Sequence, residues 1–232
     1  MQLRHELANA VIQAIGAKSF LQLGSARALD QIDCAGKQSY FLEAADQIQS
    51  GKRYDVVFVD PPHDPGRALF ALNVGLEHLS PAGVLLVANV NPAEEWMQEV
   101  PASAGVALGQ AWRAWGEFRA RCGRVTYTAN LDHGIGVMLP ESRPTEQWIP
   151  MDFQTFSQHR ASILGLFPAD DVLAAVKRVS APEPTSAVLG MTPEPTNPVS
   201  APVSGDQPET ATDPAVPPVT APRRKRRDRG TP

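Results

Sequence analysis

The chain has 232 residues, 43% of them apolar, and a formal net charge of −4. This length allows one domain of ordinary size plus an appendage, and the apolar content is enough for a core. The small negative charge gives the whole chain no bias toward nucleic acid or anionic membranes. The longest apolar run, residues 83–88, is far shorter than the ~20 residues that a membrane span needs.

The composition changes sharply near residue 181. Residues 182–232 hold 12 of the 22 prolines and no aromatic residue, so they cannot bury enough apolar surface to offset the entropy of ordering. We therefore predict an α/β domain at 1–180 and a disordered Pro/Thr/Ala-rich tail at 181–232. The tip of the tail, PRRKRRDRG, has six Lys or Arg residues against one Asp; it could bind a phosphate-bearing, anionic partner or serve only as a solubilising terminus.

Apolar periodicity and turn residues predict the elements of the domain in chain order. They are a helix at 6–17, a strand at 19–24, a helix at 25–32, a strand at 39–43, a short helix at 44–51, a strand at 54–60, a helix at 66–79, a strand at 80–90, a helix at 109–122, two strands at 124–131 and 134–140, and two helices at 151–167 and 169–179.

This alternation of apolar strands and helices predicts a Rossmann-like three-layer sandwich with a mostly parallel sheet. The last two strands lie too close together for a crossover helix, so we expect an antiparallel C-terminal hairpin at one edge of the sheet. The interval between Gly24 and Tyr54 is short for two full strand–helix units, which is compatible with one missing unit. Ligands of open α/β sheets bind beyond the carboxyl ends of the strands, and both Gly24 and Asp60 fall at such ends.

Gly24 closes the first predicted strand, where a glycine lets the backbone approach a ligand. Ser25 follows as the candidate N-cap of a helix with free N–H groups. Because nucleotide-binding loops have several glycines and this one has a single glycine, a plain strand-to-helix turn is the alternative. Glu43 lies 19 residues after Gly24, near the spacing at which a carboxylate binds ribose hydroxyls; alternatively, residues 39–48 form one helix with Glu43 on its solvated face.

The sequence FVDPPHDPG, residues 58–66, leads from a buried strand into a turn. Pro61 and Pro62 end the strand ladder and hold the loop extended. His63 could act as a general base near neutral pH, and Asp60 could orient it or bind a metal. The alternative is a loop whose acid caps the next helix and whose histidine is merely exposed.

The two cysteines, Cys34 and Cys122, are isolated, and neither belongs to a CxxC pair or has a histidine at a metal-binding spacing. We expect reduced, buried thiols and no metal site. Residues 1–18 have no uninterrupted hydrophobic core followed by a cleavage site. Together these features lead us to expect a cytoplasmic protein.

Residues 54–92, YDVVFVDPPHDPGRALFALNVGLEHLSPAGVLLVANVNP, resemble the central segment of class I S-adenosylmethionine-dependent methyltransferases. In one branch of that family the strand ends in Ile-Asp-Gly-x-His, and Asp60 and His63 fall on its Asp and His. The sequence LQLGSARAL looks like an altered form of the first family motif, Leu-Glu-Ile-Gly-x-x-x-Gly, with Gln22 in place of Glu and Ala28 in place of the later Gly.

The segments AWRAWGEFRAR, LDHGIGVMLP and DFQTFSQHRASILGLF resemble the last part of a branch associated with glycosyltransferases and sugar-containing polymers, so that the resemblance covers about residues 8–178. It implies S-adenosylmethionine as the cofactor, bound by Gly24, Ser25, Glu43 and Asp60. It also implies that Asp60 and His63 lie near the transferred methyl group, as catalytic residues. The acceptor would be an oxygen or nitrogen of a small molecule or a glycan.

Two other interpretations stay open. Asp-Pro-Pro followed by Tyr or Phe is typical of methyltransferases that modify the amino groups of nucleic-acid bases, and there the aromatic ring stacks on the flipped base. In this chain His63 replaces that ring. The altered first motif is also compatible with a catalytically degenerate member that keeps the fold as an interaction module. The sequence does not indicate the oligomeric state.

Overall fold

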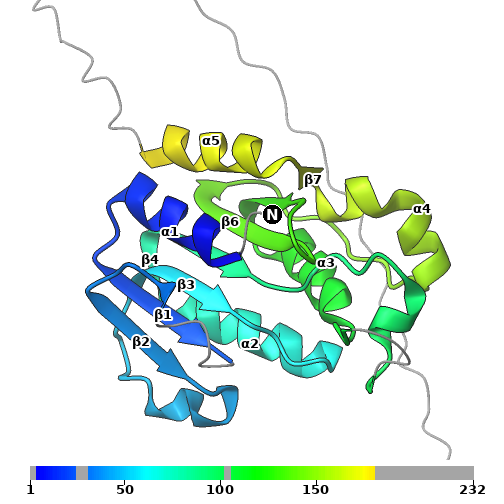
Figure 1. Ribbon diagram of the computed structural model, residues 1–232, viewed down its shortest axis with the longest axis horizontal. Coiled ribbons are helices and arrows are strands. Elements are labelled where there is room, and N and C mark those ends of the chain that lie inside the picture. Colours follow the sequence, from blue (N-terminus) through cyan, green and yellow to red (C-terminus); the bar gives the residue numbers. More distant parts are fainter. Residues whose placement is uncertain (1–3, 25–30, 102–105, 181–232) are drawn as a thin grey trace, which may run out of the picture. The chain divides into compact units, whose positions relative to one another are not determined.

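A computed structural model describes residues 4–24, 31–101 and 106–180 (Figure 1). These described residues belong to one compact unit. The predicted disordered tail at 181–232 lies outside the described residues, as does most of the helix predicted at 25–32. No helix in the described ranges is long and apolar enough to cross a membrane.

The described strands form one seven-stranded sheet in the order β2-β1-β3-β4-β6-β5-β7. Their bounds are β1 (Ser19–Leu23), β2 (Gly36–Tyr40), β3 (Tyr54–Val59), β4 (Leu79–Val87), β5 (Arg124–Ala129), β6 (Ile135–Ser142) and β7 (Leu166–Phe167).

Strands β2, β1, β3 and β4 pair in parallel, and β6 runs antiparallel to both β4 and β5. The mostly parallel α/β Rossmann-like fold and the antiparallel hairpin of β5 and β6 are therefore confirmed. The hairpin is not the outermost pair, because the two-residue strand β7 adds in parallel beyond β5. Between β1 and β3 the described residues hold one strand, β2, as the short interval before Tyr54 predicts.

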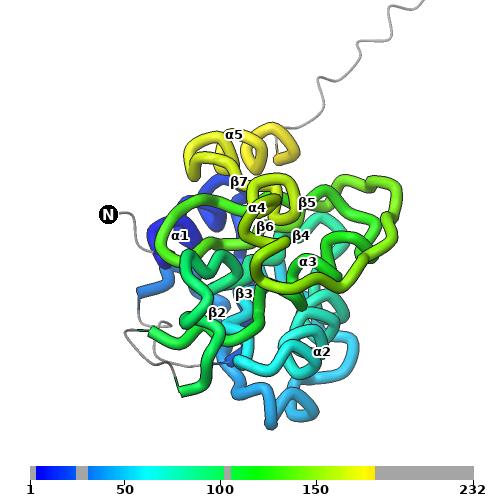
Figure 2. Tube along the Cα trace, turned by 90° about the vertical axis from the view of Figure 1, so that its right-hand side faces the viewer, coloured from blue at the N-terminus to red at the C-terminus, as the bar shows by residue number. Residues whose placement is uncertain are grey.

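Helices cover both faces of the sheet, as Figures 1 and 2 show. They are α1 (Arg4–Ile15), α2 (Pro65–Glu77), α3 (Ala111–Arg121), α4 (Phe153–Leu164) and α5 (Ala169–Ser180), with short 3-10 helices η2 (Leu42–Gln47) and η3 (Glu95–Gln98). Successive residues of a strand point to opposite faces. In β3, Val57 and Val59 accordingly pack with α2, α3 and α4, whereas Val56 and Phe58 pack with α1 and α5.

Several predicted boundaries are wrong, and two of them change the local structure. The strand expected at 39–43 is β2, which ends at Tyr40, and the chain then turns directly into η2. The helix expected at 151–167 is α4, which ends at Leu164 because Gly165 adopts the left-handed conformation (φ 60°) that terminates helices. The two following residues form β7 instead.

Candidate functional site

A cavity of about 330 Å³ lies at the carboxyl ends of β1 and β3. These neighbouring strands lie where the order along the sheet reverses, from β2-β1 on one side to β3-β4 on the other. In open α/β sheets this reversal creates a crevice in which ligands bind. The walls come from the start of α1, η2, the loop after β3, the start of α2 and the residues after β4.

Gly24 and Asp60 are in direct contact in this cavity, as their positions at neighbouring strand ends predict. The Asp60 N–H donates to the carbonyl oxygen of Leu23 at 2.8 Å. Gly24 has φ +114°, and a Cβ added there would lie 3.1 Å from Asp60 Cβ and would overlap the Asp60 carbonyl oxygen. The glycine is thus needed for the close approach of the next strand, rather than for that of a ligand alone.

The Asp60 carboxylate is largely buried, with 22% of its side chain exposed. It accepts a hydrogen bond from Nδ2 of Asn89 at 3.1 Å, and Nη1 of Arg4 lies 4.0 Å from the same oxygen. Burial raises the pKa of Asp60, and the nearby Arg4 and His63 side chains oppose that rise. Asn89 adopts a left-handed backbone (φ 63°), which asparagine tolerates better than most residues.

His63 lines the same cavity and is exposed. The His63 backbone is held in place because its carbonyl oxygen accepts a hydrogen bond from Gln110 N at 2.8 Å. In the described residues no hydrogen bond joins the His63 ring to Asp60, so the expected orienting contact is not seen. The cap of the following helix is Asp64, whose Oδ1 accepts from Arg67 N at 2.8 Å. The alternative prediction, that Asp60 caps the following helix, is therefore wrong.

Glu43 also reaches the cavity, but neither prediction for its local structure is correct. It lies in the first turn of η2, not at the end of a strand or on a long helix. Its carboxylate forms an ion pair with Arg67 of α2, and both side chains are more than half exposed. Hydrogen bonds from its own backbone N–H and from Arg67 hold the pKa of Glu43 below its usual value.

Ser25 lies outside the described residues, so its role stays a prediction. Sequence reasoning missed Arg4, Asn89, Arg67 and the exposed ring of Phe41, which all line the cavity. Asn89 had a usable signal, because it follows a buried strand as Gly24 and Asp60 do. The two arginines had none, since their partners are distant in sequence.

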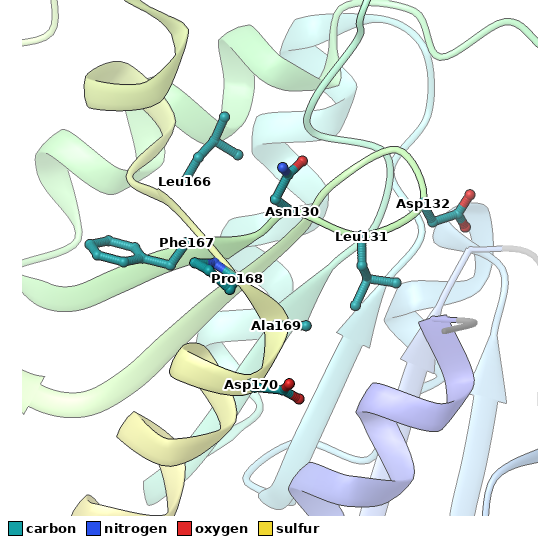
Figure 3. A pocket seen from close by; sticks show the side chains of 8 residues that line it. All are labelled: Asn130, Leu131, Asp132, Leu166, Phe167, Pro168, Ala169 and Asp170. Carbon is teal, nitrogen blue, oxygen red and sulfur yellow. The ribbon is translucent and has the colours of Figure 1, made fainter. Parts of the chain in front are cut away.

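A larger cavity, about 530 Å³, lies beside the turn between β5 and β6 and the start of α5 (Figure 3). Its three polar side chains, Asn130, Asp132 and Asp170, stand apart from one another. Leucine, phenylalanine, proline and alanine form the rest of its wall. We place the candidate site in the smaller cavity because polar groups from separate elements converge there. In the described ranges, no three His, Cys, Asp or Glu side chains are grouped to hold a metal.

No known family and no curated protein matches this sequence. Among solved structures, cofactor-bound Rv0187 from MTB is 14% identical, with a TM-score of 0.44 over 62% of this chain and 83% of that protein. An O-methyltransferase from Bacillus cereus with S-adenosylhomocysteine is 12% identical (TM-score 0.41; 60% and 82%). The O-methyltransferase TomG from Streptomyces achromogenes, with S-adenosylmethionine, is also 12% identical (0.41; 61% and 82%). Likenesses this distant say nothing of the activity of this chain, which has to be inferred from its own residues.

Proposed function

We propose that this chain is an S-adenosylmethionine-dependent methyltransferase that acts on a small molecule or a glycan. The observation that carries the proposal is the meeting of Gly24, Glu43, Asp60 and His63 at one cavity, at the reversal of strand order. Gly24, Asp60 and His63 are residues on which the sequence resembles class I methyltransferases, and Glu43 lies near the spacing after Gly24 at which a carboxylate binds ribose hydroxyls. A scaffold with no ligand has no need of such convergence.

The cavity suits a nucleoside-containing cofactor. Its volume of about 330 Å³ falls within the range of small-molecule sites, roughly 300–1,000 Å³. The Phe41 side chain is 61% exposed at its wall and offers an apolar surface on which a purine could stack. Glu43, two residues later, offers carboxylate oxygens to ribose hydroxyls.

Bound S-adenosylmethionine would supply a methyl group on a positively charged sulfur. The protein's task is then to hold the acceptor in line with that methyl group and to remove one proton from it. The exposed His63 ring is available as that base near neutral pH. Asp60, held by Asn89, contributes negative charge at the same edge of the sheet.

Isothermal titration calorimetry of the full chain with S-adenosylmethionine and S-adenosylhomocysteine tests the cofactor. We expect saturable binding that Glu43→Gln weakens and that Glu77→Gln, a change at the far end of α2, leaves unchanged. The absence of binding at millimolar ligand would overturn the enzyme proposal and favour a degenerate interaction module.

Methyl transfer tests the rest. His63→Ala should preserve cofactor affinity but reduce turnover, and unchanged turnover would remove His63 from the mechanism. Methylation of nucleic acid, but not of glycans or small molecules, would instead favour an enzyme that modifies base amino groups through the Asp60–His63 loop.

A further inference from the structure

We propose that a third cavity, at the strand ends opposite the candidate active site, binds a small oxyanion through Arg143 and Arg119. The oxyanion is a carboxylate or a phosphate group. The inference is independent of the proposed methyltransferase activity.

This cavity, of about 340 Å³, lies between the last turns of α3 and α4 and the segment 143–151. That segment leaves the sheet at the end of β6, beside the start of β5. Because β5 runs in the same direction as β3, the start of β5 lies at the end of the sheet away from the candidate active site, which is at the carboxyl ends of β1 and β3. The segment is held in place by its backbone: Arg143 N donates to the Gly123 carbonyl at 2.9 Å, and Glu146 N to the Ala120 carbonyl at 2.7 Å.

Two guanidinium groups share this cavity. Arg119 is only 8% exposed, yet it is charged at neutral pH: burial, followed by the nearby charge of Arg143, lowers its pKa to about 10. Its Nε donates to Thr126 Oγ1 at 3.1 Å and its Nη1 to the Ile163 carbonyl. Arg119 is therefore fixed in position.

Arg143 has the donor that is left unused. Its Nη2 donates to the Arg119 carbonyl at 3.0 Å and lies 3.3 Å from Glu146 Oε1. Its Nε is buried and has no hydrogen-bond partner in the described part of the chain. A buried N–H of a charged group is costly to leave unpaired. A small rotation of the Arg143 side chain would turn Nε toward the cavity, where an oxyanion would accept a hydrogen bond from it.

The charge balance points to the same ligand. Of the charged side chains that line the cavity, two are cationic and one, Glu146, is anionic. Glu146 is 68% exposed, so solvent screens its charge. Guanidinium groups suit carboxylate and phosphate because their planar donors match pairs of oxygens.

One side of the cavity wall is apolar and favours a ligand that carries an apolar group beside its oxyanion. Trp148 packs so closely on α3 that a Cβ on Gly116 would lie 2.5 Å from its ring. Ile149 and Met151 continue this apolar side of the cavity. A carboxylate with an aromatic body, such as benzoate, would use both halves, whereas inorganic phosphate would use the arginines alone.

Titration of the full chain with sodium phosphate and, separately, sodium benzoate tests the site, with sodium chloride at equal ionic strength as the reference. Tryptophan fluorescence and calorimetry report binding, and no nucleoside ligand is present. We expect saturable binding of at least one oxyanion in the millimolar range. Benzoate alone would identify a carboxylate with an apolar body, phosphate alone a phosphate group, and saturation by neither would overturn the proposal.

Two variants, Arg143→Gln and Glu146→Gln, locate the site, and a third, Arg121→Gln, is the control. Arg143→Gln should abolish saturation, and Arg121→Gln, an exposed arginine at the end of α3 that pairs with Glu117, should not change it. Glu146→Gln removes the competing carboxylate and should tighten binding by up to about fivefold, the usual effect of an exposed ion pair. Because residue 146 is exposed, this variant decides the matter even if Arg143→Gln does not fold. Normal binding by Arg143→Gln, or unchanged or weaker binding by Glu146→Gln, would contradict the proposal.

Discussion

The contact between the ends of β1 and β3 makes Gly24→Ala the most direct test of how the candidate site is built. An alanine there would have to keep φ near +114° and place its methyl group against the Asp60 carbonyl. The strand ends would separate, and the cavity wall would move with them. We expect the variant to lose stability as well as any ligand that the cavity binds.

The size of the effect follows from two terms. A left-handed backbone costs a residue other than glycine about 1–2 kcal/mol, and inserting a methyl group into a packed contact typically costs about 1–3 kcal/mol more. Gly16 provides a control for a positive φ, because its φ is +63° but an added Cβ would meet nothing within 4 Å. Gly16→Ala should therefore lose about 1–2 kcal/mol and Gly24→Ala roughly 2–5 kcal/mol.

Urea unfolding followed by circular dichroism measures both free energies. In a domain of this size each kcal/mol lowers Tm by about 2–4 °C, so thermal scans should rank the variants in the same order. Equal losses of stability in the two variants would refute the inference that the Asp60 carbonyl, and not the backbone conformation alone, requires glycine at position 24.

Three further predictions concern stability and binding. Because burial raises the pKa of Asp60, ionising its carboxyl group in the folded protein costs stability. Below about pH 4 the carboxyl group is protonated and this cost is absent; the full cost applies once the pH has risen through the folded pKa. Asp60→Asn should therefore raise Tm at pH 7.5 but not at pH 3.5. An equal rise in Tm at both pH values would contradict this prediction. Thr128→Val removes the buried hydroxyl that accepts a hydrogen bond from Trp115 Nε1 at 2.9 Å, so the free energy of unfolding should fall by about 1–3 kcal/mol. Thr128→Ser keeps a hydroxyl and should lower the free energy of unfolding by less. Arg67→Gln releases Glu43 and should tighten S-adenosylhomocysteine binding up to about fivefold in calorimetry, whereas weaker binding would show that Arg67 itself holds the ligand.

Local sequence was sufficient where one strand carries its own signal. In β3, residues 56–59 form a continuous apolar run, as expected for a parallel strand covered on both faces. It fixed the neighbouring polar residue, Asp60, at a carboxyl strand end. The parallel direction of β1 then placed Gly24 at the same edge, and the structure bears this out.

The other half of the cavity depends on contacts between distant residues. Glu43 and Arg67 are 24 positions apart, and Asn89 and Asp60 are 29 apart. No periodicity within a window of one helix or strand reveals such pairs. The local structure of Glu43 was missed for a different reason. The apolar residues that precede it have the composition of a strand, but Phe41 and Leu42 leave the sheet and line the cavity.

The position of β6 between β4 and β5 has a consequence for how this domain is made. A chain synthesised only as far as residue 129 has β4 but not the strand that covers its open edge, where Leu85, Leu86 and Val87 pair with β6. Such an apolar edge is a template for pairing with other chains. Contacts that close late in synthesis also slow folding, because distant segments must meet first. Fragments that stop before β6 should therefore aggregate, and nascent chains of this protein should depend on chaperones until residue 142 has emerged.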